Sequence, residues 1–130
     1  MLSDATVTAN IPAADLGRAK QFYADMLGLT PDREGNGGLV YRTEAGSVFF
    51  VYETQYAGMA GHTIAQLHVD DLDLEVKELQ ARGMTFEHYD MEGLTWDGAI
   101  ATAPEMGRVA WFKDSEGNIL CLDEADPATI

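Results

Sequence analysis

The sequence repeats its own pattern at a constant offset of 56 residues. Residues 8–23 align with residues 64–79 without a gap, which places Asp15 opposite Asp71. Each copy reads as a strand, a helix that begins at an aspartate, and three further strands. One helix covers only one face of such a sheet, so the other face must pack against another part of the protein. We therefore expect an α+β fold in which tandem βαβββ modules form a curved mixed sheet around a cleft.

The first copy carries the signals of a strand, a helix and a hairpin. Residues 5–11 alternate and are rich in Thr and Val, which is typical of a strand. Asp15 is a suitable N-cap for the apolar stripe that follows, and Gly28 suits the left-handed position that ends a helix. Residues 39–43 and 47–53 are apolar runs joined by "EAG", which predicts a hairpin.

The second copy repeats these signals and adds one long segment. Residues 62–69 read as a strand, and either Asp70 or Asp71 can cap the helix that Gly83 ends. Three further strands are predicted at residues 84–89, 108–114 and 118–124. The segment 91–107 contains glycines and a proline, and a loop of this length in a compact domain is usually functional or mobile.

A chain of 130 residues is expected to form one domain, here residues 1–130. Within it we assign module one to about 5–53, a linker to 54–61, module two to about 62–124 and a frayed tail to 125–130. The boundaries follow the repeat, because each module begins with the strand that precedes its helix.

Charge and composition narrow the class of partner. The chain has 22 acidic and 8 basic residues, a net charge of −14, which makes nucleic acid and anionic membranes poor partners and would attract a cationic ligand. The same excess can serve solubility alone. No apolar run approaches the roughly 18 residues of a membrane span, the N-terminus lacks the pattern of a secretion signal, and Cys121 is the single cysteine. We therefore expect a cytoplasmic protein without disulfides.

Three phrases of the sequence resemble the vicinal oxygen chelate superfamily. They are "NIPAADLGRAKQFYADMLGL", "LHVDDLDLEVKELQARG" and "VAWFKDSEGNILCL". This group includes glyoxalase I, extradiol dioxygenases, fosfomycin-modifying enzymes and bleomycin-resistance proteins. The resemblance covers nearly the whole chain and implies the fold, but not the activity, because one fold hosts many sites. It also implies a homodimer, in which clefts are sometimes built at the subunit interface, and two-fold pairs are the commonest assembly.

The resemblance further implies four cleft positions that hold His or Glu ligands in the metal-dependent members. In this sequence they fall at Thr8, Phe50, Ile64 and Cys121. Phenylalanine and isoleucine offer no lone pair, a threonine hydroxyl is a weak ligand, and one thiolate is not a site. We therefore expect a member that lacks the usual metal ligands and carries no cofactor.

Strand alternation predicts which other side chains line the cleft. Side chains two residues apart share a face, so Gln66 and His68 should point with Ile64 into the cleft, away from the helix. The same alternation selects the residues of the other strands, and Trp96 and Trp111 could stack on a flat or cationic ligand. The predicted ligand-binding residues are Thr8, Asn10, Phe50, Tyr52, Gln66, His68, Trp96, Trp111 and Cys121. The aromatic residues can equally belong to the core, and a one-residue bulge would turn Glu53 inward instead.

His68 is the weak catalytic candidate. It lies about 13 Å along the strand from Ile64, so it cannot replace the inherited ligand without new partners. His62 is nearer, at about 7 Å. A histidine can act as a general base near neutral pH, but the sequence identifies no partner for His68.

The function that these patterns favour is metal-independent binding of a hydrophobic or cationic small molecule, as in sequestration by bleomycin-resistance proteins. One alternative is an enzyme, either a lyase or oxygenase with rearranged metal ligands or a metal-free acid–base catalyst that uses His68. Another is an interaction module whose cleft is filled by side chains. The sequence favours binding over catalysis without deciding between them, and it does not identify the ligand.

Overall fold

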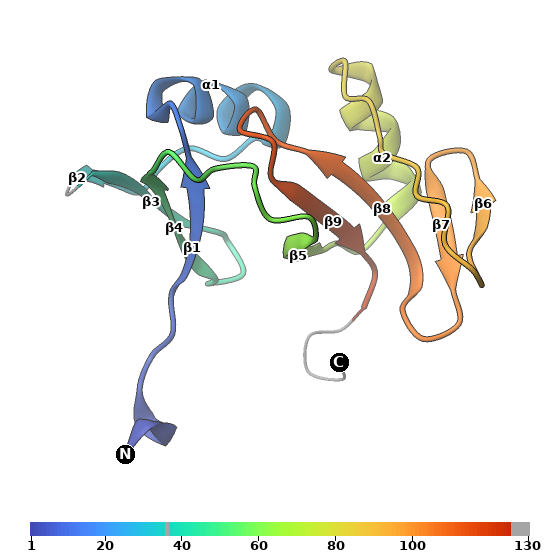
Figure 1. Cartoon of the computed structure of the whole chain (residues 1–130), viewed down its shortest axis with the longest axis horizontal. Helices are drawn as coiled ribbons and strands as arrows, with labels where there is room; N and C mark the ends of the chain where they lie inside the picture. The colour runs from blue at the N-terminus through green and yellow to red at the C-terminus, as the bar shows by residue number, and fades with distance from the viewer. Residues whose placement is uncertain (36, 126–130) are drawn as a thin grey trace.

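Each copy of the repeat folds into a mixed sheet with one helix, as Figure 1 shows for residues 1–35 and 37–125, the part of the chain that this computed structural model describes. Module one comprises β1 (Ala9–Ala13), α1 (Leu16–Leu27), β2 (Arg33–Gly35), β3 (Gly38–Arg42) and β4 (Val48–Glu53). Module two comprises β5 (Thr63–His68), α2 (Leu72–Ala81), β6 (Thr95–Asp97), β7 (Ile100–Ala103), β8 (Gly107–Lys113) and β9 (Ile119–Asp123). The predicted α+β class is confirmed, with two βαβββ-like modules that form two mixed sheets; module two has one more strand after its helix than module one.

The two modules share one strand topology, which module two extends by a fifth strand, β6. Over the described residues, module one forms a sheet in the order β1-β4-β3-β2 and module two a sheet in the order β5-β9-β8-β7-β6. The first strand of each module runs parallel to the last, and the remaining neighbours are antiparallel. β1 and β5 are therefore edge strands of their sheets, and Figure 1 shows both towards the middle of the molecule.

Aspartate caps begin both helices, as the repeat predicts. The Asp15 side chain accepts a hydrogen bond of 3.0 Å from the backbone N–H of Arg18, and Asp71 accepts one of 3.1 Å from Leu74. Asp71, not Asp70, is therefore the cap of α2. Each such cap satisfies one of the backbone N–H groups that a helix start leaves free, which is worth about 1 kcal/mol.

Each helix packs on one sheet and builds a separate core. Under α1 the fully buried side chains include Tyr23, Tyr41 and Val51, and under α2 they include Leu72 and Phe112. Burying a side chain of this size contributes about 1.5–3 kcal/mol. The stripe of apolar residues in each helix thus decides which face of its sheet is covered and which stays open.

The first strand begins later than predicted. The sequence pattern places it at 5–11, whereas β1 spans Ala9–Ala13. Its partner β4 reaches no further than the residues around Phe49, which lies opposite Ala9. Residues 5–8 have no paired strand beside them among the described residues, and Figure 1 shows this segment running away from the body of the fold.

The prediction of a strand at 84–89 is wrong. Within the described residues of that stretch, Glu87 alone joins a ladder, through an isolated bridge to Trp111. Met84 and Phe86 are buried in the core under α2. The period-two pattern detected this alternating burial, but β7 pairs with the first part of β8, Gly107–Val109, and only Glu87 pairs with the part beyond it.

The predicted loop at 91–107 contains a β-hairpin. Strands β6 and β7 pair with Asp97 opposite Ile100, and Gly98 between them has a φ of 60°. Glycine adopts positive φ without strain, and tight hairpin turns require it. The Asp97–Gly98 dipeptide is thus a hairpin signal that the prediction overlooked. The predicted tail lies outside the described residues after Ala125, and no helix in the described ranges is long and apolar enough to cross a membrane.

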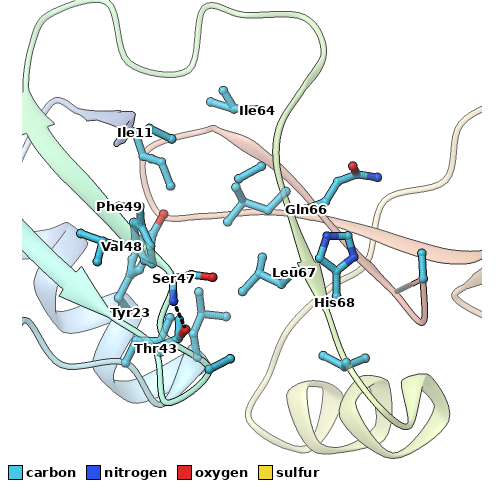
Figure 2. A pocket seen from close by; sticks show the side chains of 18 of the residues that line it. Ile11, Tyr23, Thr43, Ser47, Val48, Phe49, Ile64, Gln66, Leu67 and His68 are labelled. Atoms are coloured by element: carbon cyan, nitrogen blue, oxygen red, sulfur yellow. Dashed lines mark hydrogen bonds between the residues drawn. The ribbon is translucent and has the colours of Figure 1, made fainter. Parts of the chain in front are cut away.

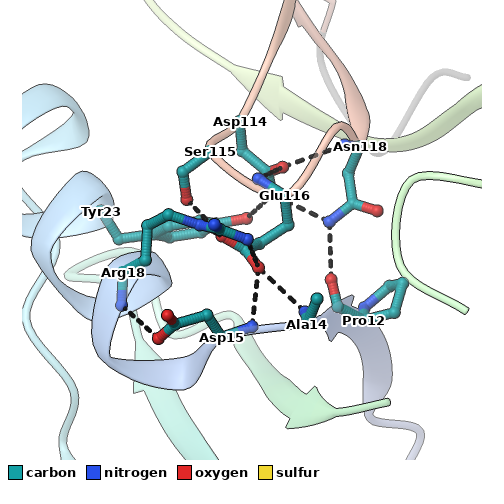
Figure 3. A network of polar contacts seen from close by, with 9 residues as sticks. All are labelled: Pro12, Ala14, Asp15, Arg18, Tyr23, Asp114, Ser115, Glu116 and Asn118. Carbon is teal, nitrogen blue, oxygen red and sulfur yellow. Dashed lines mark hydrogen bonds and ion pairs between the residues drawn. The ribbon is translucent and has the colours of Figure 1, made fainter. Parts of the chain in front are cut away.

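The turn between β8 and β9, residues 114–118, ties module two to module one (Figure 3). Glu116 Oε1 accepts backbone hydrogen bonds from Ala14 at 2.8 Å and Asp15 at 2.9 Å, where α1 begins. The guanidinium of Arg18 donates to both Glu116 oxygens at 2.8 and 3.0 Å. We call this turn with its module-one partners the intermodule latch.

Two more side chains of the turn reach across to module one. Tyr23 donates its hydroxyl to Asp114 at 2.8 Å, and the Asn118 amide donates to the carbonyl of Pro12 at 2.8 Å. Asn118 also donates to Asp114 within the turn, at 2.9 Å. Because buried polar groups are costly when unpaired, this closed network allows few relative positions of the two modules.

The buried carboxylate of Glu116 is held in its ionised form. Burial alone would raise its pKa, but hydrogen bonds from Arg18, the Asp15 backbone and Ser115 outweigh burial and lower the pKa to about 2. The Glu116 side chain is 0% exposed. A carboxylate with this many partners fixes the position of the β8–β9 turn against the start of α1. It therefore also fixes the relative position of the two modules, whose side chains form the walls of the site described next.

Candidate functional site

A cavity of about 860 Å³ lies between the two modules (Figure 2). Much of its wall is apolar and comes from both cores, including Ile11, Tyr23, Leu27, Phe49, Leu67 and Leu120. Its polar lining consists of Thr43 and Ser47 from the β3–β4 turn and of Gln66, His68, Asp70 and Glu124 from module two. This size and make-up are typical of small-molecule sites. We call it the intermodule cavity.

Most of the wall of this cavity does not come from the open sheet faces from which the cleft was predicted, although Ile64, Gln66 and His68 do line it. Ile11 and Phe49 lie on the face of their sheet that α1 covers, and Leu67 packs towards α2. Strand alternation assigns these side chains to helix packing, and they do pack there. The cavity lies where side chains of the two cores face each other without filling the space between them. The size of this space depends on how the intermodule latch places the two modules. No local pattern of the sequence encodes it.

His68 stands at the wall of the intermodule cavity with an acidic partner behind it. Its Nδ1 lies 2.6 Å from Oδ1 of Asp123, which faces it in the parallel register of β5 and β9. Asp123 is 3% exposed, and it also accepts hydrogen bonds from Gln66 at 3.3 Å and from the Ala125 backbone at 3.1 Å. His68 as a whole residue is exposed, but its side chain is only 25% exposed. The sequence analysis did not find this partner, although strand parity puts Asp123 and Cys121 on one face.

The module-one members of the predicted set gather elsewhere. Thr8, Asn10 and Phe50 line a second cavity of about 490 Å³ on the open face of their sheet. The Phe50 ring lies across Gly38, where an added Cβ would come within 2.3 Å of Phe50 Cζ. Tyr52 lies on the same strand two residues on, opposite Gly38, and is half-buried. These residues do not share a cavity with His68.

Trp111, Cys121 and Trp96 form a third group, on the face of the second sheet opposite α2. Trp96 packs on Trp111 with ring centroids 6.2 Å apart, and His88 stacks on Trp96 at 4.1 Å. Trp111 donates its indole N–H to Thr63 Oγ1 at 3.2 Å. One face of the Trp96 ring is therefore already covered by His88. None of the three predicted residues lines the intermodule cavity.

The four positions at which the resemblance expects metal ligands do not converge. Thr8 and Phe50 line the cavity on the open face of the first sheet, whereas Ile64 lines the intermodule cavity and Cys121 lines neither. Burial, followed by the nearby charge of Asp123, raises the pKa of the Cys121 thiol to about 12, whereas a metal requires the thiolate. These residues do not fit the family's metal. In the described residues no three His, Cys, Asp or Glu side chains form a group that could hold a metal ion.

Comparison with known proteins points to one family. The model of the Glyoxalase/Bleomycin resistance protein/Dioxygenase superfamily matches residues 5–122. No curated protein matches the chain significantly.

Solved structures of this fold are similar over nearly their whole length. A bleomycin-binding protein complexed with bleomycin is 18% identical, with a TM-score of 0.69 over 93% of this chain and 98% of that chain. A bleomycin resistance determinant encoded on the transposon Tn5 is 19% identical, with a TM-score of 0.69 over 90% and 94%. A lactoylglutathione lyase from Agrobacterium tumefaciens is 16% identical, with a TM-score of 0.63 over 93% and 95%. At such identities the likeness shows the fold alone.

Proposed function

Because the chain belongs to the glyoxalase/bleomycin resistance protein/dioxygenase superfamily, we propose that it is a metal-independent protein that binds and sequesters a hydrophobic or cationic small molecule. The observation that carries this proposal is the intermodule cavity, about 860 Å³ with a largely apolar wall and a few polar groups. Pockets of roughly 300–1,000 Å³ with this lining are the usual form of small-molecule sites.

Two further features support the proposal. The net charge of −14 would raise the local concentration of cations around the protein. The four family ligand positions carry Thr8, Phe50, Ile64 and Cys121, whose side chains are poor partners for a divalent metal. Among proteins of this fold, one is described as bleomycin-binding in complex with bleomycin, which shows that the fold can serve binding.

The proposal is tested by thermal unfolding of the chelator-treated protein with a panel of apolar amines and neutral aromatics. A ligand of the folded state at a hundred times its Kd adds about 2.7 kcal/mol of stability. Ile64→Trp places a large ring in the cavity and should abolish the gain, whereas Val7→Trp, on an exposed residue outside the cavity, should not. A stabilisation equal in both variants would count against the cavity.

Metal independence has its own measurement. Elemental analysis after incubation with zinc, nickel, manganese and iron and removal of the excess should give less than about a tenth of an equivalent of each metal. About one equivalent of any single metal would instead support the lyase or oxygenase with rearranged ligands.

A second candidate function is metal-free acid–base catalysis, and the pairing of His68 with Asp123 at 2.6 Å favours it. A carboxylate on Nδ1 orients an imidazole and leaves Nε2 to take a proton, as general bases require. In D2O, NMR of added α-hydroxy ketones would reveal exchange of the carbon-bound proton. Exchange that His68→Gln removes would support catalysis, and its absence would leave binding as the better account.

We further propose a homodimer built on the open face of the first sheet. Val40, Phe50 and Tyr52 are half-buried there, and none of them belongs to the core under α1. Apolar faces of this kind usually find cover in a second subunit, and two-fold pairing is the commonest way to provide it.

A further inference from the structure

The intermodule cavity has a strongly polar end. His68 is the last residue of β5, Asp70 follows two residues later, and Glu124 comes directly after β9; all three line the cavity. Because β5 and β9 run parallel, the residues that follow both strands lie at the same end. Figure 2 shows His68 beside Gln66 on the module-two side, across from Phe49 and Val48. A ligand in the apolar body of the cavity would therefore present one of its ends to these groups.

The ring of His68 offers this end of the cavity an acceptor. The Asp123 carboxylate can only accept, so the hydrogen bond of 2.6 Å requires the proton on Nδ1. In the neutral imidazole Nε2 then carries a lone pair. Across residues 1–35 and 37–125, no hydrogen bond of the chain reaches Nε2. A ligand that meets the neutral ring of His68 is therefore recognised through an N–H or O–H that the ligand donates.

The charges at the same end are negative. Asp70 and Glu124 both carry carboxylates, and the nearby cation, Arg108, already donates to Asp73 at 2.8 Å and to Glu124 at 3.0 Å. Asp70 forms none of the ion pairs found among the described residues. Arg108 offsets the charge of Glu124, so Asp70 is the carboxylate at this end that can attract a positive charge and repel a negative one.

The start of α2 could in principle attract an anion, because helix N-termini carry partial positive charge. Two of its free N–H groups are already used by carboxylates of the chain. Glu124 Oε2 accepts from Leu72 at 3.2 Å, and Asp71 accepts from Leu74 at 3.1 Å. An anionic ligand would have to displace these oxygens, so the helix start does not reverse the preference for cations.

We infer that the cavity takes ligands with an apolar body and a protonated amine at one end, an assignment that rests on the proposed function of the intermodule cavity. The ammonium donates one N–H to Nε2 of His68 and faces the carboxylate of Asp70. The apolar body lies against the core side chains between the modules. A hydroxyl at the same position would use His68 but gain little from Asp70, and a carboxylate would be repelled by the Asp70 charge.

Three probes with one naphthalene body test this inference on the full chain. They are 2-(1-naphthyl)ethylamine, 2-(1-naphthyl)ethanol and 1-naphthylacetate, compared by calorimetric titration at pH 7.5 with chelator present. We expect the amine to bind about tenfold more tightly than the alcohol, and the carboxylate to bind more weakly than either. His68→Leu should cost the amine about tenfold in affinity. The matched control is His62→Leu, at a residue outside the cavity, and it should change nothing.

Asp70→Asn is a second variant that does not threaten the fold, because Asp70 is exposed. It should weaken the amine about threefold and leave the alcohol unchanged. Equal affinity for the three probes, or a preference for the carboxylate, would overturn the amine assignment while leaving the binding function intact. Failure of all three probes to bind would overturn both. Equal losses of amine and alcohol in Asp70→Asn would also contradict the assignment.

Discussion

The imidazole of His68 and the carboxylate of Asp123 lie 2.6 Å apart, facing each other across the parallel pair of β5 and β9. The carboxylate is buried, and the imidazole stands between it and the intermodule cavity. This arrangement decides which ring nitrogen is offered to a ligand, and therefore whether the site accepts or donates a hydrogen bond.

We predict that neutral His68 is the tautomer protonated at Nδ1. Long-range 1H–15N NMR of the labelled protein separates protonated from unprotonated ring nitrogens, and His68→Gln assigns the signals. Asp123→Leu should remove the preference, since it removes the acceptor at Nδ1. A ring protonated at Nε2 in the unmodified protein would contradict the acceptor role that the amine assignment requires.

Glu116→Gln should weaken the intermodule latch in a pH-dependent way. The pKa of Glu116 falls from 4.5 to about 2 on folding, so its contribution is fully present above about pH 4.5 and disappears as pH falls towards 2. We expect the variant to be about 2 kcal/mol less stable than the unmodified chain at pH 7, with the difference shrinking below pH 4.5. Urea unfolding at a series of pH values measures it.

Glu34→Gln provides the matched control for this series, because Glu34 is an exposed carboxylate that pairs with Lys20 on the surface. Its effect should stay within about 0.5 kcal/mol at every pH. A stability difference for Glu116→Gln that is the same at pH 2.5 and pH 7 would contradict the ionised latch.

Gly58→Ala should destabilise the fold through the linker between the modules. A Cβ at Gly58 would lie 2.6 Å from the backbone oxygen of Glu116, and its φ of +74° already disfavours any other residue. We expect a loss of about 2–4 kcal/mol in chemical unfolding. Gly98→Ala shares a positive φ, +60°, but meets nothing within 4 Å, so it should lose about 1 kcal/mol. Equal losses would mean that the linker does not sit against the latch.

Phe50→Asp tests the dimer. Light scattering with size-exclusion chromatography should give twice the mass of 14.2 kDa for the unmodified chain and a single mass for the variant. The change puts a charge on the open face of the first sheet, where Phe50 is half-buried, and should not disturb the core under α1. A dimer that survives the substitution would place the interface elsewhere.

Much of the fold could be predicted from local signals. The repeat predicted the two modules, and both aspartate caps lie where the pattern places them. Strand parity correctly sent Leu67 towards the core and Gln66 away from it. One error arose where period two was the sole guide, and another where a turn signal was overlooked. Residues 84–89 alternate in burial without joining a sheet, and the hairpin after Thr95 was hidden in an apparent loop.

The site could be predicted only in part, for a different reason. Gln66 and His68 do line the intermodule cavity, but Asn10 and Phe50 lie on another face, and Trp111 lies on a third. The alternation of side chains along a strand assigns each side chain to one face of its own sheet. It does not predict how two sheets are placed relative to each other. That placement depends on buried hydrogen bonds between residues about a hundred positions apart, such as those of Glu116 with the start of α1.

The most direct test of the central claim is an amide NMR titration of the 15N-labelled protein with 2-(1-naphthyl)ethylamine in the presence of excess chelator. The account predicts saturable shifts confined to the cavity walls, at Ser47–Phe49 and Ile64–Asp70, that are unchanged when metal ions replace the chelator. Shifts that require added metal, or that map to the open face around Asn10 and Phe50, would contradict metal-independent binding in the intermodule cavity.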